Sequence, residues 1–435
     1  MRVTLVVQYV KFIYFKELSF EAKGFKQIAN FLIFKKNYMR TKNILSLFLI
    51  VILLFYSCKN NKTDVRLTEI KISPKISNDE ILQSLIKDIK IIKLQTTDSA
   101  LIKYIWKLEY IRNRFYIQTL PNKPIFVFDS IGNYIYSIGK HGKGPGEFIQ
   151  LVDYLINEEE DNVILFSWPD KTLYYTLDGK YLRETKAKLP IYKSIKINKN
   201  LFAVYIGCGT IMPDGEEPPS DIVFTDANFN IISKYKKRPA YKNKMGAYTN
   251  IFSKWNENIS YLGEYSYTVC LIKNKNLIPQ FYLNFGEYQI TEEFLKRNQN
   301  INPVEYFNKI KNEYAHFIRY AQNENYFWVE YYLKLNTLDK HFAIYSKKDS
   351  KVLNFSCDKK QPLTKLLSTI ISNYKEEFIF LVEASDFKEI SEDIKDKLVN
   401  SSTKKTKYLN DILKISSQTK ETDNPLLIIL TLKHN

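Results

Sequence analysis

Cysteine and histidine are scarce in this chain of 435 residues, and their spacing excludes several kinds of site. The four cysteines include no CxxC pair, so zinc-ribbon and thioredoxin-type chemistry have no support. A disulfide between Cys208 and Cys270 stays open, because spacing alone does not decide it. The four histidines are scattered, at positions 141, 316, 341 and 434, and they form neither a metal motif nor a Ser-His-Asp arrangement. We therefore predict no metal and no cofactor.

A dense block of basic residues is also missing, although the formal net charge is +17. Residues 1–57 carry nine basic and two acidic residues. The rest of the chain has 55 basic and 45 acidic residues, which are spread evenly along it. Nucleic-acid binding requires a concentrated basic surface, so this pattern argues against a nucleic-acid partner.

Residues 39–58 predict export. A short basic start at Met39 precedes the apolar run Ile44–Tyr56. This run is shorter than the roughly 20 residues that span a bilayer, but it has the length of the apolar region of a secretory signal. Cys58 follows where cleavage would occur.

The residues from Leu54 to Cys58 (LFYSC) resemble the lipobox of Bacteroidetes lipoproteins, with bulky Phe55 and Tyr56 where small residues are usual. The resemblance implies that the Cys58 thiol carries a diacylglycerol and anchors the protein in the outer membrane. The alternative is a signal anchor with an incidental cysteine. We interpret the start of the chain as an upstream extension before the true first residue Met39 (1–38), a signal peptide (39–57) and a lipidated tether (58–65). Whether the protein faces the periplasm or the cell surface stays open, with a lean towards the periplasm.

Strand–turn–strand units recur along residues 66–435. The second strands of five hairpins begin near residues 133, 180, 229, 276 and 351. The first three intervals, 47, 49 and 47 residues, match the roughly 40–50 residues of a four-stranded propeller blade. Two further strand-like runs precede each hairpin, so each unit contains four strands, here called A, B, C and D in chain order.

A sixth unit is split. Glu377–Glu383 has the pattern of a strand B and Pro425–Lys433 that of a strand C, with no strand D after it. We expect Val65–Ser73 to pair beside the last strand and close the ring, with Asp79–Lys90 as an amphipathic crossing segment. Closure of this kind removes exposed sheet edges. The predicted fold is all-β: a six-bladed β-propeller of four-stranded antiparallel blades, closed by an N-terminal strand and carrying short helical insertions.

The segment Gly139–Phe148 (GKHGKGPGEF) connects a strand D to the next strand A and resembles the NHL-type repeat. Together with IIKLQTTDSALIKYI at 91–105, LDGK at 177–180 and NPLLIILTLK at 424–433, it makes residues 66–435 resemble the 6-bladed β-propeller lipoproteins of Bacteroidetes. The resemblance implies a surface or periplasmic lipoprotein of largely undefined activity, in some cases encoded beside nutrient-uptake systems.

The residues of this Gly-rich loop are predicted to be structural. The glycines should supply positive φ angles and Phe148 should pack between blades. A strand follows the loop instead of a helix, which argues against phosphate binding. The residues with this predicted role are Gly142, Gly144, Pro145, Gly146 and Phe148.

Long connections are predicted on one face of the propeller. D–A and B–C loops share a face, and the A–B and C–D turns on the other face are short; Glu109–Asn113 is the first A–B turn. Gly207–Ser220, Phe285–Asn312 and Ala384–Asn424 are all D–A or B–C connections, so we expect this long-loop face to bind. Candidates on it are His141, Lys143, Glu147, Trp168, Asp214, Glu216 and Glu217.

Each candidate has a structural alternative. Glu147 could instead satisfy loop amides, Trp168 could pack at the rim instead of stacking on a sugar, and the acidic residues could form a solvated loop. The leading hypothesis is a lipid-anchored envelope module that binds a glycan, a peptide or an envelope protein, without catalysis. The alternative is a hydrolase or lyase with carboxylates at the channel mouth.

Overall fold

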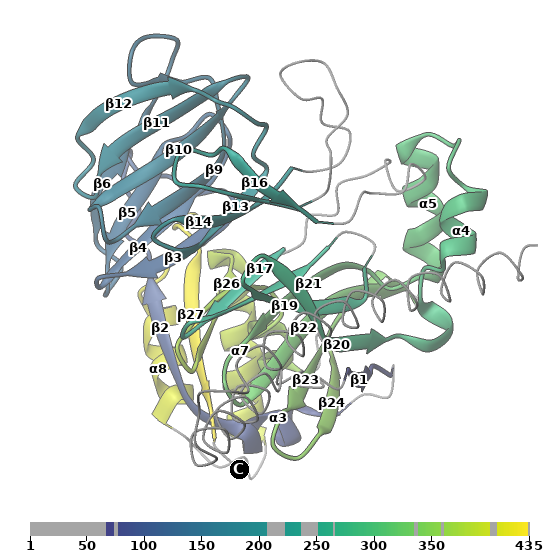
Figure 1. Cartoon of the computed structure of the whole chain (residues 1–435). Helices are drawn as coiled ribbons and strands as arrows, with labels where there is room; N and C mark the ends of the chain where they lie inside the picture. Colours follow the sequence, from purple (N-terminus) through teal and green to yellow (C-terminus); the bar gives the residue numbers. More distant parts are fainter. Residues whose placement is uncertain are drawn as a thin grey trace, which may run out of the picture. The chain divides into compact units, whose positions relative to one another are not determined.

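The computed structural model describes residues 67–73, 77–206, 222–235, 251–263, 266–334, 338–357, 361–400 and 407–433 (Figure 1). The chain divides into two compact units, residues 1–64 and residues 65–435, and every described residue belongs to the second. Within the described residues, the long strands form six sheets, and five of these sheets follow one another along the chain.

The first three blades have four strands each. Blade 1 contains β3 (Lys107–Ile111), β4 (Arg114–Gln118), β5 (Ile125–Asp129) and β6 (Tyr134–Ile138). Blade 2 contains β9 (Gln150–Asn157), β10 (Asn162–Trp168), β11 (Lys171–Thr176) and β12 (Tyr181–Lys186). Blade 3 contains β13 (Lys193–Asn198), β14 (Leu201–Tyr205), β15 (Ile222–Thr225) and β16 (Ile231–Lys234).

The other three blades include the strands nearest the start of the described chain. Blade 4 contains β17 (Phe252–Trp255), β18 (Asn258–Leu262), β19 (Thr268–Lys273), β20 (Asn276–Asn284) and β1 (Thr68–Lys71). Blade 5 contains β21 (His316–Gln322), β22 (Tyr326–Lys334), β23 (Leu338–Ser346) and β24 (Lys351–Ser356). Blade 6 contains β25 (Ile370–Tyr374), β26 (Glu377–Val382), β27 (Leu426–Leu432) and β2 (Ile86–Lys93).

Short turns with a defined chemistry set the hairpins. In blade 1, Asp129 ends β5 and its Oδ1 accepts the backbone N–H groups of Ile131 and Asn133 at 3.0 and 2.8 Å. Gly132 in the same turn has φ +94°, which glycine adopts without strain. Asp226 directly follows β15 in blade 3 and accepts the same bonds from the N–H groups of Asn228 and Asn230. A side chain that bonds its own turn favours this tight reversal, so the predicted hairpins are confirmed.

Six apolar cores lie between neighbouring blades and complete the ring. Between blades 1 and 2 the core includes Phe148 and Leu165, and between blades 3 and 4 it includes Phe224 and Ile259. Similar cores join blades 2 and 3, 4 and 5, 5 and 6, and 6 and 1. Since every blade contributes side chains to two cores, the predicted six-bladed propeller with antiparallel four-stranded blades is confirmed.

The strand that closes the ring is a different one from the expected segment. β2 pairs with β27 in antiparallel register, from Ile86 opposite Leu432 to Lys93 opposite Leu426, and supplies the missing strand D of blade 6. The expected segment, Val65–Ser73, contains β1, which instead pairs in parallel with β20 of blade 4. Closure by a strand from the N-terminal side is thus correct, but Val65–Ser73 is not that strand. β2 has the longer apolar stripe, with Ile86, Ile89 and Ile92 all buried.

The helical insertions fill cores instead of lining a cavity. α4 (Glu292–Arg297) and α5 (Pro303–Glu313) lie in the link between blades 4 and 5, and Leu295, Tyr306 and Ile310 are part of the core between those blades. The other helices pack in the core between blades 5 and 6. They are α3 (Asp79–Leu85), α6 (Pro362–Leu366), α7 (Ala384–Asn400) and α8 (Lys407–Ser417).

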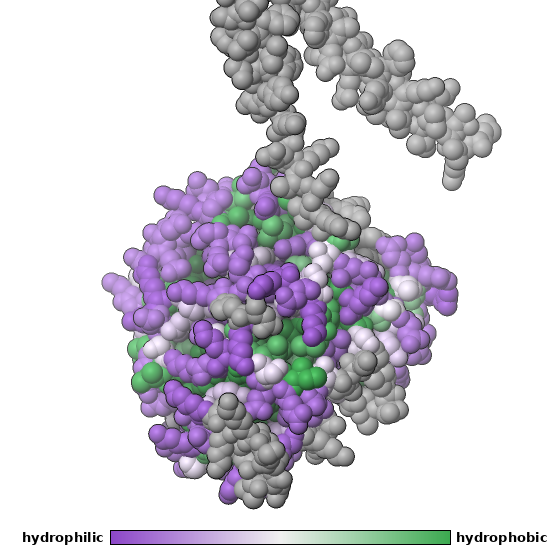
Figure 2. Space-filling view, turned by 90° about the horizontal axis from the view of Figure 1, so that it is seen from below, coloured by the Kyte–Doolittle hydropathy of each residue, from purple (hydrophilic) through white to green (hydrophobic). Residues whose placement is uncertain are grey.

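Hydrophilic residues cover most of the described surface in the view of Figure 2, and hydrophobic residues show only in small patches between them. Among the described helices, none is both long enough and apolar enough to cross a membrane.

Candidate functional site

The Gly-rich loop is a compact connection between blades 1 and 2. β7 (Lys140–His141) pairs in parallel with β8 (Glu147–Phe148), and the Glu147 carboxylate accepts the Gly144 N–H at 3.0 Å. The Lys140 ammonium lies 2.9 Å from the same carboxylate, and with the loop N–H it lowers the pKa of Glu147. Glu147 therefore satisfies its own loop, which is the structural alternative stated above.

The glycines of this loop have different roles. Gly146 has φ +70°, as expected, and donates its N–H to Glu184 at 2.9 Å. Gly142 and Gly144 are not at positive φ, so the prediction was wrong for these two. At Gly142 a Cβ atom would lie 2.0 Å from Glu147 Oε2, so a larger residue there would displace the Glu147 carboxylate. Pro145 lies between these glycines and is exposed, and no contact of its ring points to binding.

Phe148 is fully buried in the core between blades 1 and 2, as predicted. His141 and Lys143 are exposed on the same connection. The loop contacts the outer strands of blade 2, where the Lys171 ammonium donates to the Gly144 carbonyl at 3.1 Å. The loop is thus a rim element of the long-loop face, away from the innermost strands.

Trp168 is 59% exposed at the end of β10 and precedes a cis peptide bond to Pro169. Trp168 is therefore not part of a core, and its position at the rim is compatible with both rim packing and ligand stacking. The three acidic candidates and two of the cysteines lie outside the described residues: Asp214, Glu216, Glu217, Cys58 and Cys208. Within the described residues, Cys270 forms no disulfide.

Charged side chains gather on the inner strands of blades 1, 2 and 3, and we call them the inner-strand ion cluster. It consists of Lys107 and Glu109 on β3, Asp153 on β9 and Lys193 on β13. The Lys107 ammonium lies 3.1 Å from Glu109 Oε1 and 3.1 Å from Asp153 Oδ1, so the two carboxylates are less than about 7 Å apart. The Lys193 ammonium lies 3.9 Å from Asp153.

The members of this cluster differ in their burial and in the hydrogen bonds that they make. Asp153 is fully buried, and its Oδ2 accepts both the N–H and the hydroxyl of Ser194, at 2.7 and 2.6 Å. The side chains of Glu109 and Lys193 are 27% and 26% exposed. Asp153 is therefore the structural centre of the cluster, whereas Glu109 and Lys193 are partly exposed to solvent.

Burial shifts the pKa values of this cluster in opposite directions. It raises the pKa of Glu109, although attraction to Lys107 opposes the shift. It lowers the pKa of Lys193, and repulsion from Lys107 adds to this effect while Asp153 opposes it. For Lys107 burial alone would lower the pKa, but Asp153 and Glu109 outweigh it and the pKa is raised. The cluster thus combines a carboxyl that gains a proton easily with an ammonium that loses one easily.

Exposed aromatic side chains lie at the same end of these blades. Trp106 directly precedes β3 and is 39% exposed, and Tyr192 directly precedes β13 and is 49% exposed. Both lie in D–A links, and Trp168 lies in the B–C turn of blade 2, so topology puts all three on the long-loop face. Lys107 and Lys193 are the first residues of their strands and lie at the same end.

On the other side of the axis the inner strands touch. The Asn373 amide on β25 donates to the Lys254 carbonyl on β17 at 2.7 Å, and its oxygen accepts the Ser253 hydroxyl at 3.1 Å. The inner strands of blades 4 and 6 are thus bonded directly.

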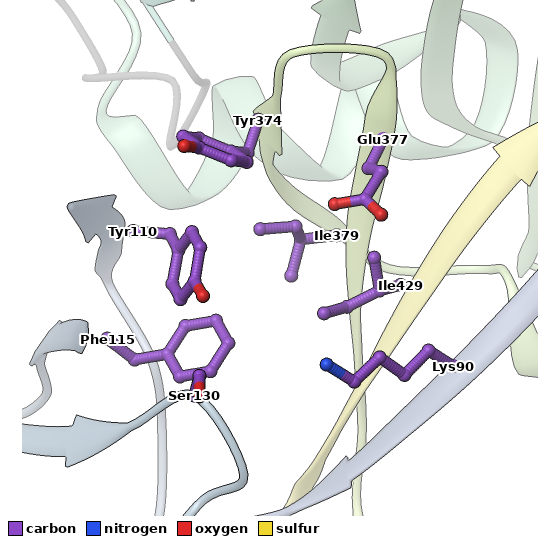
Figure 3. A pocket seen from close by; sticks show the side chains of 8 residues that line it. All are labelled: Lys90, Tyr110, Phe115, Ser130, Tyr374, Glu377, Ile379 and Ile429. Atoms are coloured by element: carbon purple, nitrogen blue, oxygen red, sulfur yellow. The ribbon is translucent and has the colours of Figure 1, made fainter. Parts of the chain in front are cut away.

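A small crevice lies between blades 6 and 1 (Figure 3). The Lys90 ammonium and the Glu377 carboxylate point into it from one wall, and the Tyr110 and Tyr374 rings stand opposite, with centroids 4.9 Å apart. Its volume of about 50 Å³ is far below the roughly 300–1,000 Å³ of small-molecule sites. Tyr374 and Glu377 flank an A–B turn, so the crevice opens on the short-turn face and holds at most a few waters.

Sequence reasoning missed the ion cluster. It placed Glu109 in a turn, Glu109–Asn113, whereas β3 continues to Ile111 and only Arg112 and Asn113 form the turn. One signal was available, because charged residues lie beside aromatic residues at all three inner strands: WKLEY, VDY and YKS. Among the described residues, no group of three or more His, Cys, Asp or Glu side chains is arranged to hold a metal.

Comparisons with known proteins agree with this architecture. The family described as "Domain of unknown function (DUF4934)" matches residues 67–431. A Bacteroides fragilis protein described as a "Putative exported protein" has a similar structure, with a TM-score of 0.68 and 20% identity, covering 85% of this chain and 100% of that one. This likeness bears on the fold alone.

Two further solved structures match less well. A member of the DUF4221 family from Bacteroides vulgatus has a TM-score of 0.46 and 12% identity, covering 81% of this chain and 99% of that one. BamB from Moraxella catarrhalis has a TM-score of 0.35 and 9% identity, covering 68% of this chain and 72% of that one. None of the curated proteins compared matches the sequence significantly.

Proposed function

We propose that this chain, which belongs to the DUF4934 family of unknown function, is a lipid-anchored binding module of the cell envelope whose ligand is a glycan. The observation that carries the proposal is the exposed aromatic set Trp106, Trp168 and Tyr192 on the long-loop face. Exposure of an aromatic ring to water is unfavourable, so exposed aromatic residues on one face commonly mark a recognition surface. Glu109 and Lys193 lie on the same blades and offer an acceptor and a donor for hydroxyl groups.

A glycan suits this surface better than a peptide. The apolar faces of sugar rings pack on aromatic side chains, while sugar hydroxyls need fixed polar partners. Lys107 holds the Glu109 carboxylate in place, and Asp153 holds the Lys193 ammonium. These two side chains therefore lose little conformational entropy when a ligand binds, which favours affinity.

The binding proposal is tested with a glycan array probed with the purified protein, followed by titration of the best ligand. Trp168→Ala and Tyr192→Ala should each weaken binding about threefold to tenfold. Ile131→Ala is the matched control, because Ile131 is 67% exposed in a short turn on the opposite face. Equal affinity of all variants would contradict the proposed surface. If the protein bound peptides from a pool and bound no glycan, the proposed ligand would be a peptide instead of a glycan.

The anchor is proposed from residues 39–58 alone. Labelled fatty acid should enter the chain in cells, and Cys58→Ser should abolish the label while leaving the amount of protein measurable. Label that persists in Cys58→Ser would remove the lipid anchor from the proposal.

A lyase or hydrolase is the second candidate, favoured by the opposite pKa shifts of Glu109 and Lys193. In such reactions a carboxyl group with a raised pKa can serve as the general acid, and an amine with a lowered pKa can serve as the general base. Asp153 is too fully bonded to act as a nucleophile, so hydrolysis by two carboxylates lacks its second group. Cleavage of a bound glycan that stops in Glu109→Gln, with binding retained, would favour the enzyme.

A further inference from the structure

The first described strand leaves the propeller in a defined direction. β1 pairs in parallel with β20, from Thr68 opposite Phe281 to Lys71 opposite Asn284, and lies beside it at the outer edge of blade 4 (Figure 1). Ile70 is fully buried in the core between blades 4 and 5, and the Ile72 N–H donates to the Asn284 carbonyl at 2.8 Å. The chain is therefore fixed at this rim.

The parallel pairing gives the direction. β20 starts at the short turn Asn274–Lys275 and ends towards the link that carries α4 and α5. Because β1 runs the same way, its amino end points to the short-turn face. Cys58 is nine residues before Leu67, so it is within about 30 Å of that rim even when the chain is fully extended.

The short turns beside this exit are basic. Lys275 lies in the turn of blade 4 and Lys273 directly precedes it. Lys348 lies in the turn of blade 5 and Lys351 directly follows it. All four side chains are exposed. Asp349 is the only acidic residue in these two C–D turns. We call these four lysines the basic turn patch.

The corresponding turns elsewhere in the ring have a different charge. Those of blades 1 and 3 are built around Asp129 and Asp226 and contain no lysine. The turn of blade 2 balances Asp178 with Lys180. Among these five C–D turns, positive charge is thus concentrated on blades 4 and 5, the two blades that flank β1.

We propose that the basic turn patch contacts the anionic phospholipid surface of the membrane that holds the anchor, so that the long-loop face points away from the bilayer. The orientation rests on the proposed lipid anchor, whereas the lysine contact does not require it. Exposed lysines beside an anionic membrane are attracted to it over about one Debye length, and a short tether lets them come within that range. The aromatic set then faces the solution, where it can meet a large ligand.

Acetylation footprinting of the full chain tests this proposal. The protein is bound to vesicles that contain phosphatidylglycerol or to pure phosphatidylcholine vesicles, and lysine labelling is read by mass spectrometry. Labelling of the basic turn patch should fall several-fold on phosphatidylglycerol and recover in high salt. Lys143 on the long-loop face and Lys180 on the short turn of blade 2 should keep their labelling. Equal labelling of all these lysines, or protection of Lys143 instead, would overturn the proposal.

A charge variant separates this proposal from the anchor. In the unacylated Cys58→Ser chain, the four substitutions Lys273→Gln, Lys275→Gln, Lys348→Gln and Lys351→Gln should reduce the salt-sensitive part of binding to phosphatidylglycerol vesicles. The matched control replaces Lys143, Lys180, Lys186 and Lys199, four exposed lysines of blades 1–3 and the links between them, and should bind like the parent. If wild-type Cys58 is not acylated but the charge effect holds, only the anchor fails. If Cys58 is acylated and the two sets behave alike, only the orientation fails.

Discussion

Asp153 on the inner strand of blade 2 accepts two hydrogen bonds from Ser194 on the inner strand of blade 3, one from the backbone and one from the hydroxyl. Its other oxygen faces Lys107 of blade 1 at 3.1 Å. One buried carboxylate thus joins three blades whose strands are distant in sequence. An isolated buried charge is costly, so this residue holds its neighbours in place as well as being held by them.

Asp153→Ala should destabilise the fold by about 3–5 kcal/mol, because it leaves Lys107 without its buried partner and the Ser194 N–H without an acceptor. Urea unfolding followed by tryptophan fluorescence measures the loss. Asp178→Ala is the control, since Asp178 is exposed in a short turn. A loss below about 1 kcal/mol for Asp153→Ala would mean that the cluster contributes little to stability.

Phe148→Ala should destabilise the protein by about 3–5 kcal/mol, since the ring is fully buried between blades 1 and 2. His141→Ala in the same loop should change stability by less than about 0.5 kcal/mol, because that side chain is exposed. Thermal unfolding of the two variants compares them directly. If they were equally stable, Phe148 would not be the structural anchor of the Gly-rich loop.

Lys347 should give a pH-dependent contribution to stability. Burial lowers its pKa to about 8, with Glu324 and Glu376 opposing the shift, and its ammonium lies 4.8 Å from the Trp255 ring centroid. In the unfolded chain its pKa is about 10.4, so between these values the unfolded chain holds the extra proton and stability rises with pH.

The measurement is the difference in unfolding free energy between the parent and Lys347→Met. Below about pH 8 the cost of burying the charge is fully present, and it disappears as the pH approaches about 10.4. Between about pH 7 and pH 10 the unfolding free energy of the parent should therefore rise by up to about 3 kcal/mol relative to that of Lys347→Met. A constant difference over that range would show that Lys347 has an ordinary pKa in the folded protein.

Cys270 should react slowly with iodoacetamide at neutral pH. Burial raises the pKa of its thiol to about 11, which leaves very little of the reactive thiolate. Peptide mapping should show alkylation of Cys270 only after unfolding, with no reducing agent required. If reduction were required first, Cys270 would be in a disulfide, and Cys208 would be the first partner to test.

The blades were predictable because their signals are local. Alternating apolar residues mark a strand, and Asp129 or Asp226 marks a turn within a few residues of it. The identity of the closing strand was not predictable in this way, since Thr68–Lys71 and Ile86–Lys93 both read as strands and their partners lie hundreds of residues away. Pairing across such distances depends on how the finished edges fit, which no short stretch of sequence contains.

The site was less predictable than the fold. Trp168 was a candidate because it was predicted on the long-loop face, where it could stack on a sugar, and its side chain is exposed. Glu109, Asp153 and Lys193 lie on strands of three different blades, and they become a cluster only when the ring is formed. Glu147 shows the opposite case, in which a suggestive local motif serves only its own loop.

Blade 6 combines strands from distant parts of the chain, because β2 pairs with β27. Without β2 the edge of β27 would be open to pairing with other chains, so we expect a ring that lacks β2 to be unstable. Folding must therefore wait until both segments are present, and a break in either should release the whole assembly at once. We expect unfolding to be cooperative, with no order in which single blades peel away.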